Sequence, residues 1–169
     1  MVTLDKSYVS PVPTNWTQQS VQDFAETTAA KLGYQPGGDI EHVVRLLGGM
    51  VTDEHWDSPS ATGYIEVRDS RDFTINLSPL ASGTRRRFTT AHELGHYILH
   101  THMGKLHPVR ITREGSNRLE WEANWFAAGF LMPTAEFKRL VKEGRNDAEL
   151  AFHFDVSMSA VEIRRTVLG

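Results

Sequence analysis

The sequence contains no cysteine among its 169 residues. This absence excludes disulfide bonds, thiol catalysis and zinc sites built on cysteine, so any metal ion must be held by histidine or carboxylate side chains. The chain also has no excess of positive charge. Its formal net charge of −3 at pH 7 does not support a generally basic surface for nucleic acid. We therefore do not expect nucleic acid to be bound directly.

Long apolar segments are missing as well. The N-terminal stretch MVTLDKSYVSPVPTNW has no apolar core of signal-peptide length, and no apolar run in the sequence reaches membrane-spanning length. We therefore expect a soluble, cytoplasmic protein with no membrane contact. Hydrophobic residues make up 40% and charged residues 23% of the chain, which is typical of an ordinary globular domain.

Hydrophobic periodicity and capping residues predict the order of the secondary-structure elements. Two helices are expected over residues 17–32 and 39–47, followed by strands in MVTDEHW, ATGYIEVRD and DFTINLSP. A long helix that carries AHELGHYILH, a helix over residues 118–132 and short C-terminal helices follow. This order indicates an α+β fold with a small mixed sheet.

We expect three parts along the chain. Residues 1–15 have little periodicity and are predicted to form an extended N-terminal arm, and residues 16–133 to form the core. Residues 134–169 are predicted to be a helical segment packed on that core, with a tail, LAFHFDVSMSAVEIRRTVLG, that looks like a helix-turn-helix. Packing is favoured over DNA contact, because the tail offers Arg164 and Arg165 alone as phosphate partners.

The stretch AHELGHYILH gives the strongest chemical signal. His92 and His96 are four residues apart, so on a helix their side chains project together, about one turn apart. Glu93 lies one residue round the helix from His92, close enough to contact a water on a metal ion without binding the metal itself. This is the H-E-x-x-H arrangement, in which two histidines bind zinc and the glutamate is a general base.

A catalytic zinc site needs a third protein ligand. His102 lies six residues after His96, but its use would require the helix to break, and Leu99 stands where a glycine would be needed. His100 lies about 12 Å along the helix axis from His92, too far for one ion to bridge. His100 can line the cleft, cap the end of the helix or be exposed, and of these we favour exposure.

A better candidate lies in LEWEANWFAAGFLMP. Glu120 and Asn124 are four residues apart, beside a strip of small residues that allows two helices to approach closely. The Glu120 carboxylate can then reach the metal, while Asn124 reaches the other ring nitrogen of a ligating histidine. Glu122 lies about 200° round the helix from Glu120, so both cannot face the site.

The blocks RRFTTAHELGHYILH and EWEANWFAAGFLMP, taken together, resemble the ImmA/IrrE family of zincin-like metallopeptidases over the region from DFTINLS to Pro133. The resemblance implies a zincin-like single domain with a metallopeptidase core in residues 16–133. It also implies that Glu120, four residues before the asparagine, is the third ligand. Members of the family are intracellular, and several cleave or control a helix-turn-helix repressor in phage, mobile-element or stress responses.

These observations combine into one hypothesis. His92, His96 and Glu120 hold one Zn²⁺, with Mn²⁺ as an alternative ion, and Asn124 orients a ligating histidine. Glu93 is the general base of a metallopeptidase that acts on a specific protein such as a helix-turn-helix repressor. The alternative is a non-hydrolytic, metal-containing regulator that binds a repressor or DNA. The presence of Glu93 favours the peptidase, because a structural zinc needs no base.

Substrate contacts are expected on the sheet. We predict that DFTINLS is an edge strand of the cleft that pairs with an extended substrate, with Tyr64, Thr74 and Asn76 as candidate substrate-binding residues. The side chain that stabilises the oxyanion is left open among five candidates. They are Tyr64, Tyr97, His100, His102 and His107.

Overall fold

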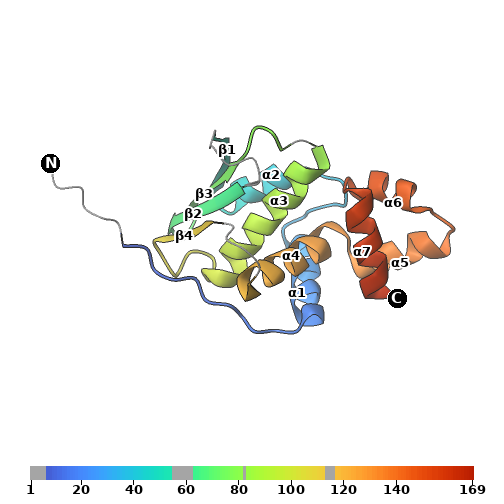
Figure 1. Ribbon diagram of the computed structural model, residues 1–169, viewed down its shortest axis with the longest axis horizontal. Helices are drawn as coiled ribbons and strands as arrows, with labels where there is room; N and C mark the ends of the chain where they lie inside the picture. Colours follow the sequence, from blue (N-terminus) through green and yellow to red (C-terminus); the bar gives the residue numbers. More distant parts are fainter. Residues whose placement is uncertain (1–6, 55–62, 82, 113–116) are drawn as a thin grey trace.

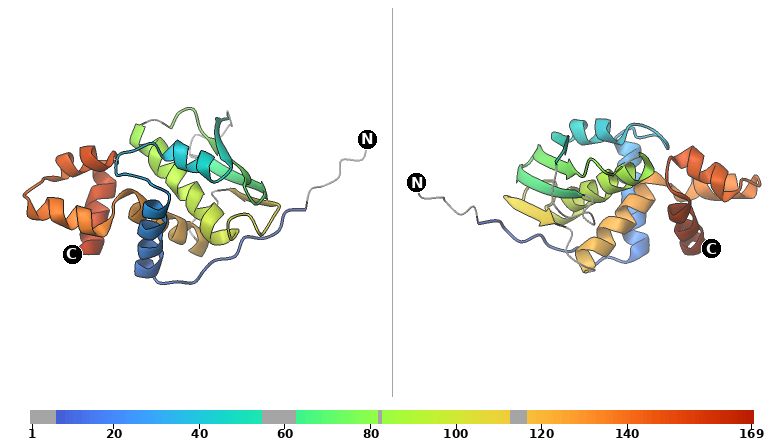
Figure 2. Two further views of the ribbon diagram at one scale, coloured as in Figure 1. Left: turned by 180° about the vertical axis from the view of Figure 1, so that it is seen from behind. Right: turned by 45° about the horizontal axis from the view of Figure 1, so that its top comes forward.

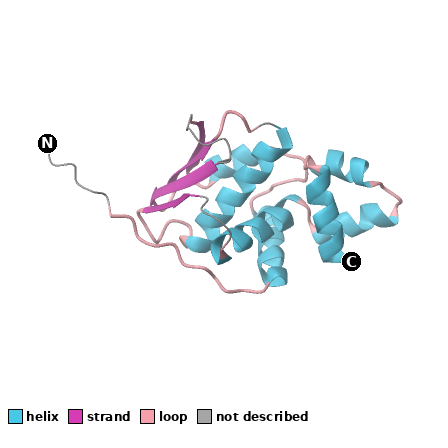
Figure 3. Cartoon of the chain, viewed as in Figure 1, coloured by secondary structure: helices cyan, strands magenta, loops and turns pink. Residues whose placement is uncertain are grey.

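A four-stranded mixed sheet covered by helices forms the scaffold of the described part of the chain (Figures 1 and 3). The computed structural model describes residues 7–54, 63–81, 83–112 and 117–169. Within them the strands are β1 (Gly49–Asp53), β2 (Gly63–Asp69), β3 (Asp72–Leu77) and β4 (Val109–Thr112). Their order in the sheet is β1-β3-β2-β4, with β1 parallel to β3 and the other pairs antiparallel. The predicted α+β class with a small mixed sheet is confirmed.

The two faces of the sheet differ in burial. Ile65 and Val67 of β2 and Phe73 and Ile75 of β3 are buried, and the Phe73 ring stacks on Tyr97 with ring centroids 3.9 Å apart. The residues between them point the other way, because side chains alternate along a strand. The buried face of the sheet is therefore the one that carries the helices.

The position of β3 corrects one prediction from the sequence. The DFTINLS strand was expected at an edge of a cleft, but it lies inside the sheet, paired with β1 on one side and β2 on the other. Its backbone hydrogen-bonding groups are used by these neighbours, so it cannot add a substrate strand. The strand predicted in MVTDEHW ends at Asp53, and His55 and Trp56 lie outside the described residues.

The helices of the core are α1 (Gln18–Lys31), α2 (Ile40–Leu46), α3 (Gly83–Gly95), the π-helical turn η1 (His96–His100) and α4 (Arg118–Leu131). Of these, α2, α3 and η1 contact the strands, whereas α4 packs on α3 and α1 packs on α4 (Figure 2). Thr17, Asp39 and Asn117 cap α1, α2 and α4 through their side chains, which accept backbone N–H groups of the first turn. The order of elements therefore follows the sequence pattern.

Helix α4 lies against both α1 and α3, which places it at the centre of the helical layer. At Gly129 a Cβ would lie 2.7 Å from the backbone oxygen of Gln22 in α1, so only glycine permits this approach. At Gly95 of α3 a Cβ would lie 3.0 Å from the ring of Phe126. These close contacts bring the α4 side chains within reach of α3.

Three further helices form the C-terminal part: α5 (Thr134–Lys142), α6 (Asp147–Phe154) and α7 (Met158–Leu168). Arg164 of α7 is 1% exposed, and it donates to the backbone oxygen of Met132 and to Glu26 of α1. Arg165 pairs with Asp147. Both arginines named as phosphate partners are thus engaged within the protein, and Arg164 ties α7 to the core.

Residues 7–17 run as an extended segment along the helical layer to the start of α1 (Figure 1). Backbone hydrogen bonds join Val9 N to Pro108 O and Val12 N to His100 O. Residues 7–15 are the described part of the predicted N-terminal arm. Among the helices of the described residues, none is long and apolar enough to cross a membrane.

Candidate metal centre

Three side chains from two helices converge in the interior. His92 and His96, one turn apart at the end of α3 and the start of η1, meet Glu120 from the first turn of α4. The Nε2 atoms of the two histidines are 3.1 Å apart. Glu120 Oε1 lies 2.9 Å from His96 Nε2, and Glu120 Oε2 lies 3.2 Å from His92 Nε2. All three residues are buried.

These separations match a metal site. A tetrahedral zinc ion with bonds of about 2.0–2.1 Å holds neighbouring ligand atoms about 3.3 Å apart. The donor set, two imidazole nitrogens and one carboxylate, is one that zinc accepts in catalytic sites with three protein ligands. The residues present therefore fit a divalent ion.

The partner of His92 fixes which of its nitrogens faces the centre. His92 Nδ1 lies 2.8 Å from Asn124 Oδ1. Because this oxygen can only accept, we assign the ring proton to Nδ1, which donates to Asn124. His92 Nε2 is then left with its lone pair directed at the centre.

A chain of two hydrogen bonds, from Glu122 through His100, sets the tautomer of His96. His100 Nε2 lies 3.0 Å from the Glu122 carboxylate, and His100 Nδ1 lies 2.8 Å from His96 Nδ1. A carboxylate accepts, so we assign the proton of His100 to Nε2, which leaves its Nδ1 as an acceptor for the Nδ1–H of His96. The relay from Glu122 through His100 thus directs the Nε2 lone pair of His96 at the centre.

Two lone pairs and a carboxylate then face one another within about 3 Å, an arrangement that a cation would stabilise. Complete burial lowers the pKa of His96 to about 3, and the hydrogen bond that a protonated Nε2 would donate to Glu120 offsets this effect only in part. His96 is therefore neutral at pH 7, as a metal ligand must be.

Glu122 is held in place by the N-terminal arm. Its carboxylate accepts from Thr14 N at 2.8 Å, Thr14 Oγ1 at 2.8 Å, Asn15 N at 2.9 Å and Arg118 Nε at 2.7 Å. Burial raises the pKa of Glu122, but the hydrogen bonds from Arg118 and Thr14 outweigh it and bring the pKa to about 2. The carboxylate is therefore ionised and orients His100.

One expectation about these residues was wrong, and another was incomplete. His100 was expected to be exposed, yet it is 0% exposed, because its ring lies between His96 and the Glu122 carboxylate of α4. Glu122 does point away from the centre, but the prediction missed that it is buried and acts through His100. A weak signal was present: His100 continues the four-residue spacing of His92 and His96.

Glu93 occupies the position next to His92 in α3 and is 2% exposed. A buried carboxylate at this place, one residue from a ligating histidine, is the arrangement expected of a general base beside a metal. The centre thus contains three donors suited to a metal, and Glu93 follows the first of them in α3.

The candidate substrate residues on the sheet lie elsewhere. Tyr64 pairs in register with Asn76, and both point to the sheet face opposite the helices, as does Thr74. The Tyr64 hydroxyl donates to Glu54, and Asn76 accepts from Thr52. The structure therefore does not bring Tyr64, Thr74 and Asn76 to the metal centre.

The other candidates for the oxyanion differ in their surroundings. Tyr97 is 1% exposed, and its hydroxyl donates to Met103 O and accepts from Arg71 N. His107 Nδ1 lies 2.7 Å from Gly104 O. His102 is exposed at the end of the helix. The geometry identifies none of them as an oxyanion donor.

Comparison with known proteins agrees with this architecture. Residues 56–166 match the peptidase family described as the IrrE N-terminal-like domain. Among solved structures, a Mycobacterium tuberculosis transcriptional regulator is similar in fold, with a TM-score of 0.59 and 17% sequence identity over 86% of this chain. The alignment spans 46% of that regulator, about half its length. No curated protein matches the chain.

The family match covers well over half of the chain, so this protein belongs to the ImmA/IrrE family, within the peptidases that share the IrrE N-terminal-like domain. The resemblance seen in the sequence is confirmed. The likeness to the mycobacterial regulator, at 17% identity, concerns the fold alone.

Proposed function

We propose that the protein is a zinc-dependent metallopeptidase of the cytoplasm. The observation that carries the proposal is the buried convergence of His92, His96 and Glu120, with Glu93 adjacent in the same helix. Membership of a peptidase family supports it. His92, His96 and Glu120 would hold the ion, zinc in preference to manganese.

Each residue has a distinct task in this proposal. A bound zinc ion supplies Lewis acidity, polarising a peptide carbonyl and lowering the pKa of water. Glu93 accepts the proton of the attacking water and delivers it to the leaving amine. Asn124 and His100 hold the two imidazoles in the tautomer that leaves each Nε2 free of a proton.

The substrate we propose is a specific regulatory protein, such as a helix-turn-helix repressor in a phage, mobile-element or stress response. This part rests on the family resemblance. The engaged state of Arg164 and Arg165 argues against the tail as a DNA-binding surface. Incubation of the zinc-loaded protein with casein and with a helix-turn-helix repressor compares generic with specific cleavage. Efficient casein digestion would contradict a narrow substrate range.

The decisive experiment replaces Glu93 with glutamine. Glu93→Gln should retain the metal, because its three ligands remain, but lose most hydrolysis, because no base accepts the proton. Glu143→Gln, an exposed site at the end of α5, is the matched control and should behave as wild type. If Glu93→Gln folds, binds zinc and cleaves at the wild-type rate, the peptidase mechanism is wrong. A repressor bound tightly and left uncut by the wild-type protein would support the non-hydrolytic regulator instead.

A further inference from the structure

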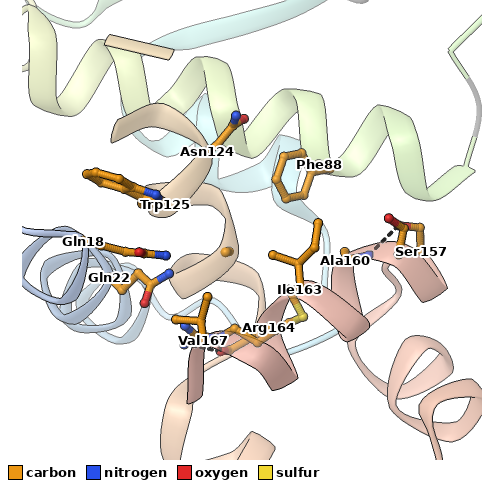
Figure 4. A pocket seen from close by; sticks show the side chains of 13 residues that line it. Gln18, Gln22, Phe88, Asn124, Trp125, Ser157, Ala160, Ile163, Arg164 and Val167 are labelled. Atoms are coloured by element: carbon orange, nitrogen blue, oxygen red, sulfur yellow. Dashed lines mark hydrogen bonds between the residues drawn. The ribbon is translucent and has the colours of Figure 1, made fainter. Parts of the chain in front are cut away.

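The two histidines of the candidate metal centre are supported in different surroundings. Asn124, which accepts from His92 Nδ1, is exposed and borders a pocket of about 400 Å³ (Figure 4). The support of His96 is enclosed instead, because His100 and Glu122 are both 0% exposed. The N-terminal arm takes part in this enclosure, since it forms hydrogen bonds with both of these residues.

The arm holds the enclosed support at both of its ends. The backbone N of Val12 donates to His100 O at 3.2 Å. Three donors of the arm reach the Glu122 carboxylate: Thr14 N at 2.8 Å, Thr14 Oγ1 at 2.8 Å and Asn15 N at 2.9 Å. A buried carboxylate that lacks such donors is costly. The arm therefore stabilises the ionised side chain that orients His100.

The local conformation of the arm favours this contact. Asn15 has a φ of 59°, in the left-handed region that asparagine tolerates better than most residues. Consecutive N–H groups in such a turn can converge on one anion, as those of Thr14 and Asn15 do here. Because a carboxylate can only accept, the Thr14 hydroxyl donates to Glu122, while it accepts from Trp16 N at 3.1 Å.

We propose that Thr14 is a positioning residue for the metal ligand His96, and that seating of the N-terminal arm and binding of the ion strengthen each other. This inference rests on the proposed function, because it requires that the three candidate ligands hold zinc. The path runs from Thr14 through Glu122 and then through His100 to the ligand. Coupling between two binding events is reciprocal, so an arm that raises zinc affinity is itself held more tightly when zinc is bound.

The first measurement is the zinc affinity of the full chain, in competition with a chelator. Thr14→Pro removes both the N–H and the hydroxyl of this residue, and it should lower the affinity about 10-fold, the lower end of the range for loss of a group that supports a ligand. Thr14→Val removes the hydroxyl alone and should cause a smaller loss, which Thr14→Ser should largely recover. Thr27→Val is the matched control, because the exposed Thr27 hydroxyl donates within α1, to Asp23 O.

Hydrogen exchange measures the coupling in the opposite direction. The amides of Thr14 and Asn15 donate to Glu122, so their exchange reports the seating of the arm. Saturating zinc should slow both amides by a similar factor, about 10-fold. The amide of Ser20, which donates to Thr17 Oγ1 at the start of α1, is the internal control and should be unaffected. An arm with a structural role alone would exchange at the same rate with and without zinc.

The outcomes separate this inference from the proposed function. Wild-type zinc affinity in a folded Thr14→Pro protein, or exchange of Thr14 and Asn15 that zinc does not change, would overturn the positioning role and leave the metallopeptidase proposal standing. Circular dichroism of the metal-free variants checks their folding. If Thr14→Pro does not fold, the comparison of Thr14→Val with Thr14→Ser decides by the same criterion. A wild-type chain that binds no zinc would contradict both the inference and the proposed function.

Discussion

Replacement of His100 with leucine should weaken metal binding although His100 does not contact the metal. The change removes the acceptor that lies 2.8 Å from His96 Nδ1. Loss of such a partner typically lowers metal affinity about 10–100-fold, which corresponds to about 1.4–2.7 kcal/mol. Glu122 keeps its hydrogen bonds from Thr14, Asn15 and Arg118, so its charge is not left unpaired. We therefore expect the metal-free variant to lose only about 1–3 kcal/mol in free energy of unfolding.

The assay is a titration of zinc against a chelator of known affinity, with circular dichroism as the check on folding. His102→Asn is the control, because His102 is exposed at a left-handed backbone position that asparagine tolerates. His100→Gln, which carries both an acceptor and a donor, should recover part of the lost affinity. A folded His100→Leu protein with wild-type zinc affinity would refute the role of the relay.

Three further predictions concern the metal and the helix packing. Glu120→Ala should abolish tight zinc binding, measured by metal analysis after dialysis, and full retention of zinc would show that another residue is the third ligand. Removal of zinc with a chelator should lower the melting temperature. An ion present at 100 times its dissociation constant adds about 2.7 kcal/mol to the free energy of unfolding. An unchanged melting temperature would argue against a bound ion. Gly129→Val should destabilise the fold by about 3 kcal/mol or more, because its Cβ would clash with the backbone of Gln22 in α1. Unfolding by denaturant measures this loss of stability. An unfolding midpoint equal to that of the wild type would contradict the packing described.

The three candidate ligands could be predicted from the sequence. The four-residue spacing of His92 and His96 fixes their common direction on a helix, and the small residues beside Glu120 indicate close approach of a second helix. Both signals depend on regular helical geometry, which short-range sequence determines well. They were sufficient to identify the three side chains that converge.

The features that the sequence did not reveal depend on contacts between distant segments. The interior place of β3 results from its parallel pairing with β1, which no local pattern encodes. His100 lies in a π-helical turn and is covered by Glu122 of α4, whereas the residues of HYILH alone are compatible with a regular helix. The surroundings of Glu122 come from Thr14, 108 positions earlier in the chain.

The hydrogen bonds between the N-terminal arm and Glu122 have a consequence for the order of assembly. The ribosome makes the arm first, but Thr14 has no Glu122 carboxylate to bind until α4 has been synthesised, 108 positions later. Closing so long a loop costs entropy that only an otherwise folded core can offset. A nascent chain therefore cannot complete the support of His96 before its core has formed. The three candidate ligands therefore gain their full hydrogen-bonded support only in the finished fold.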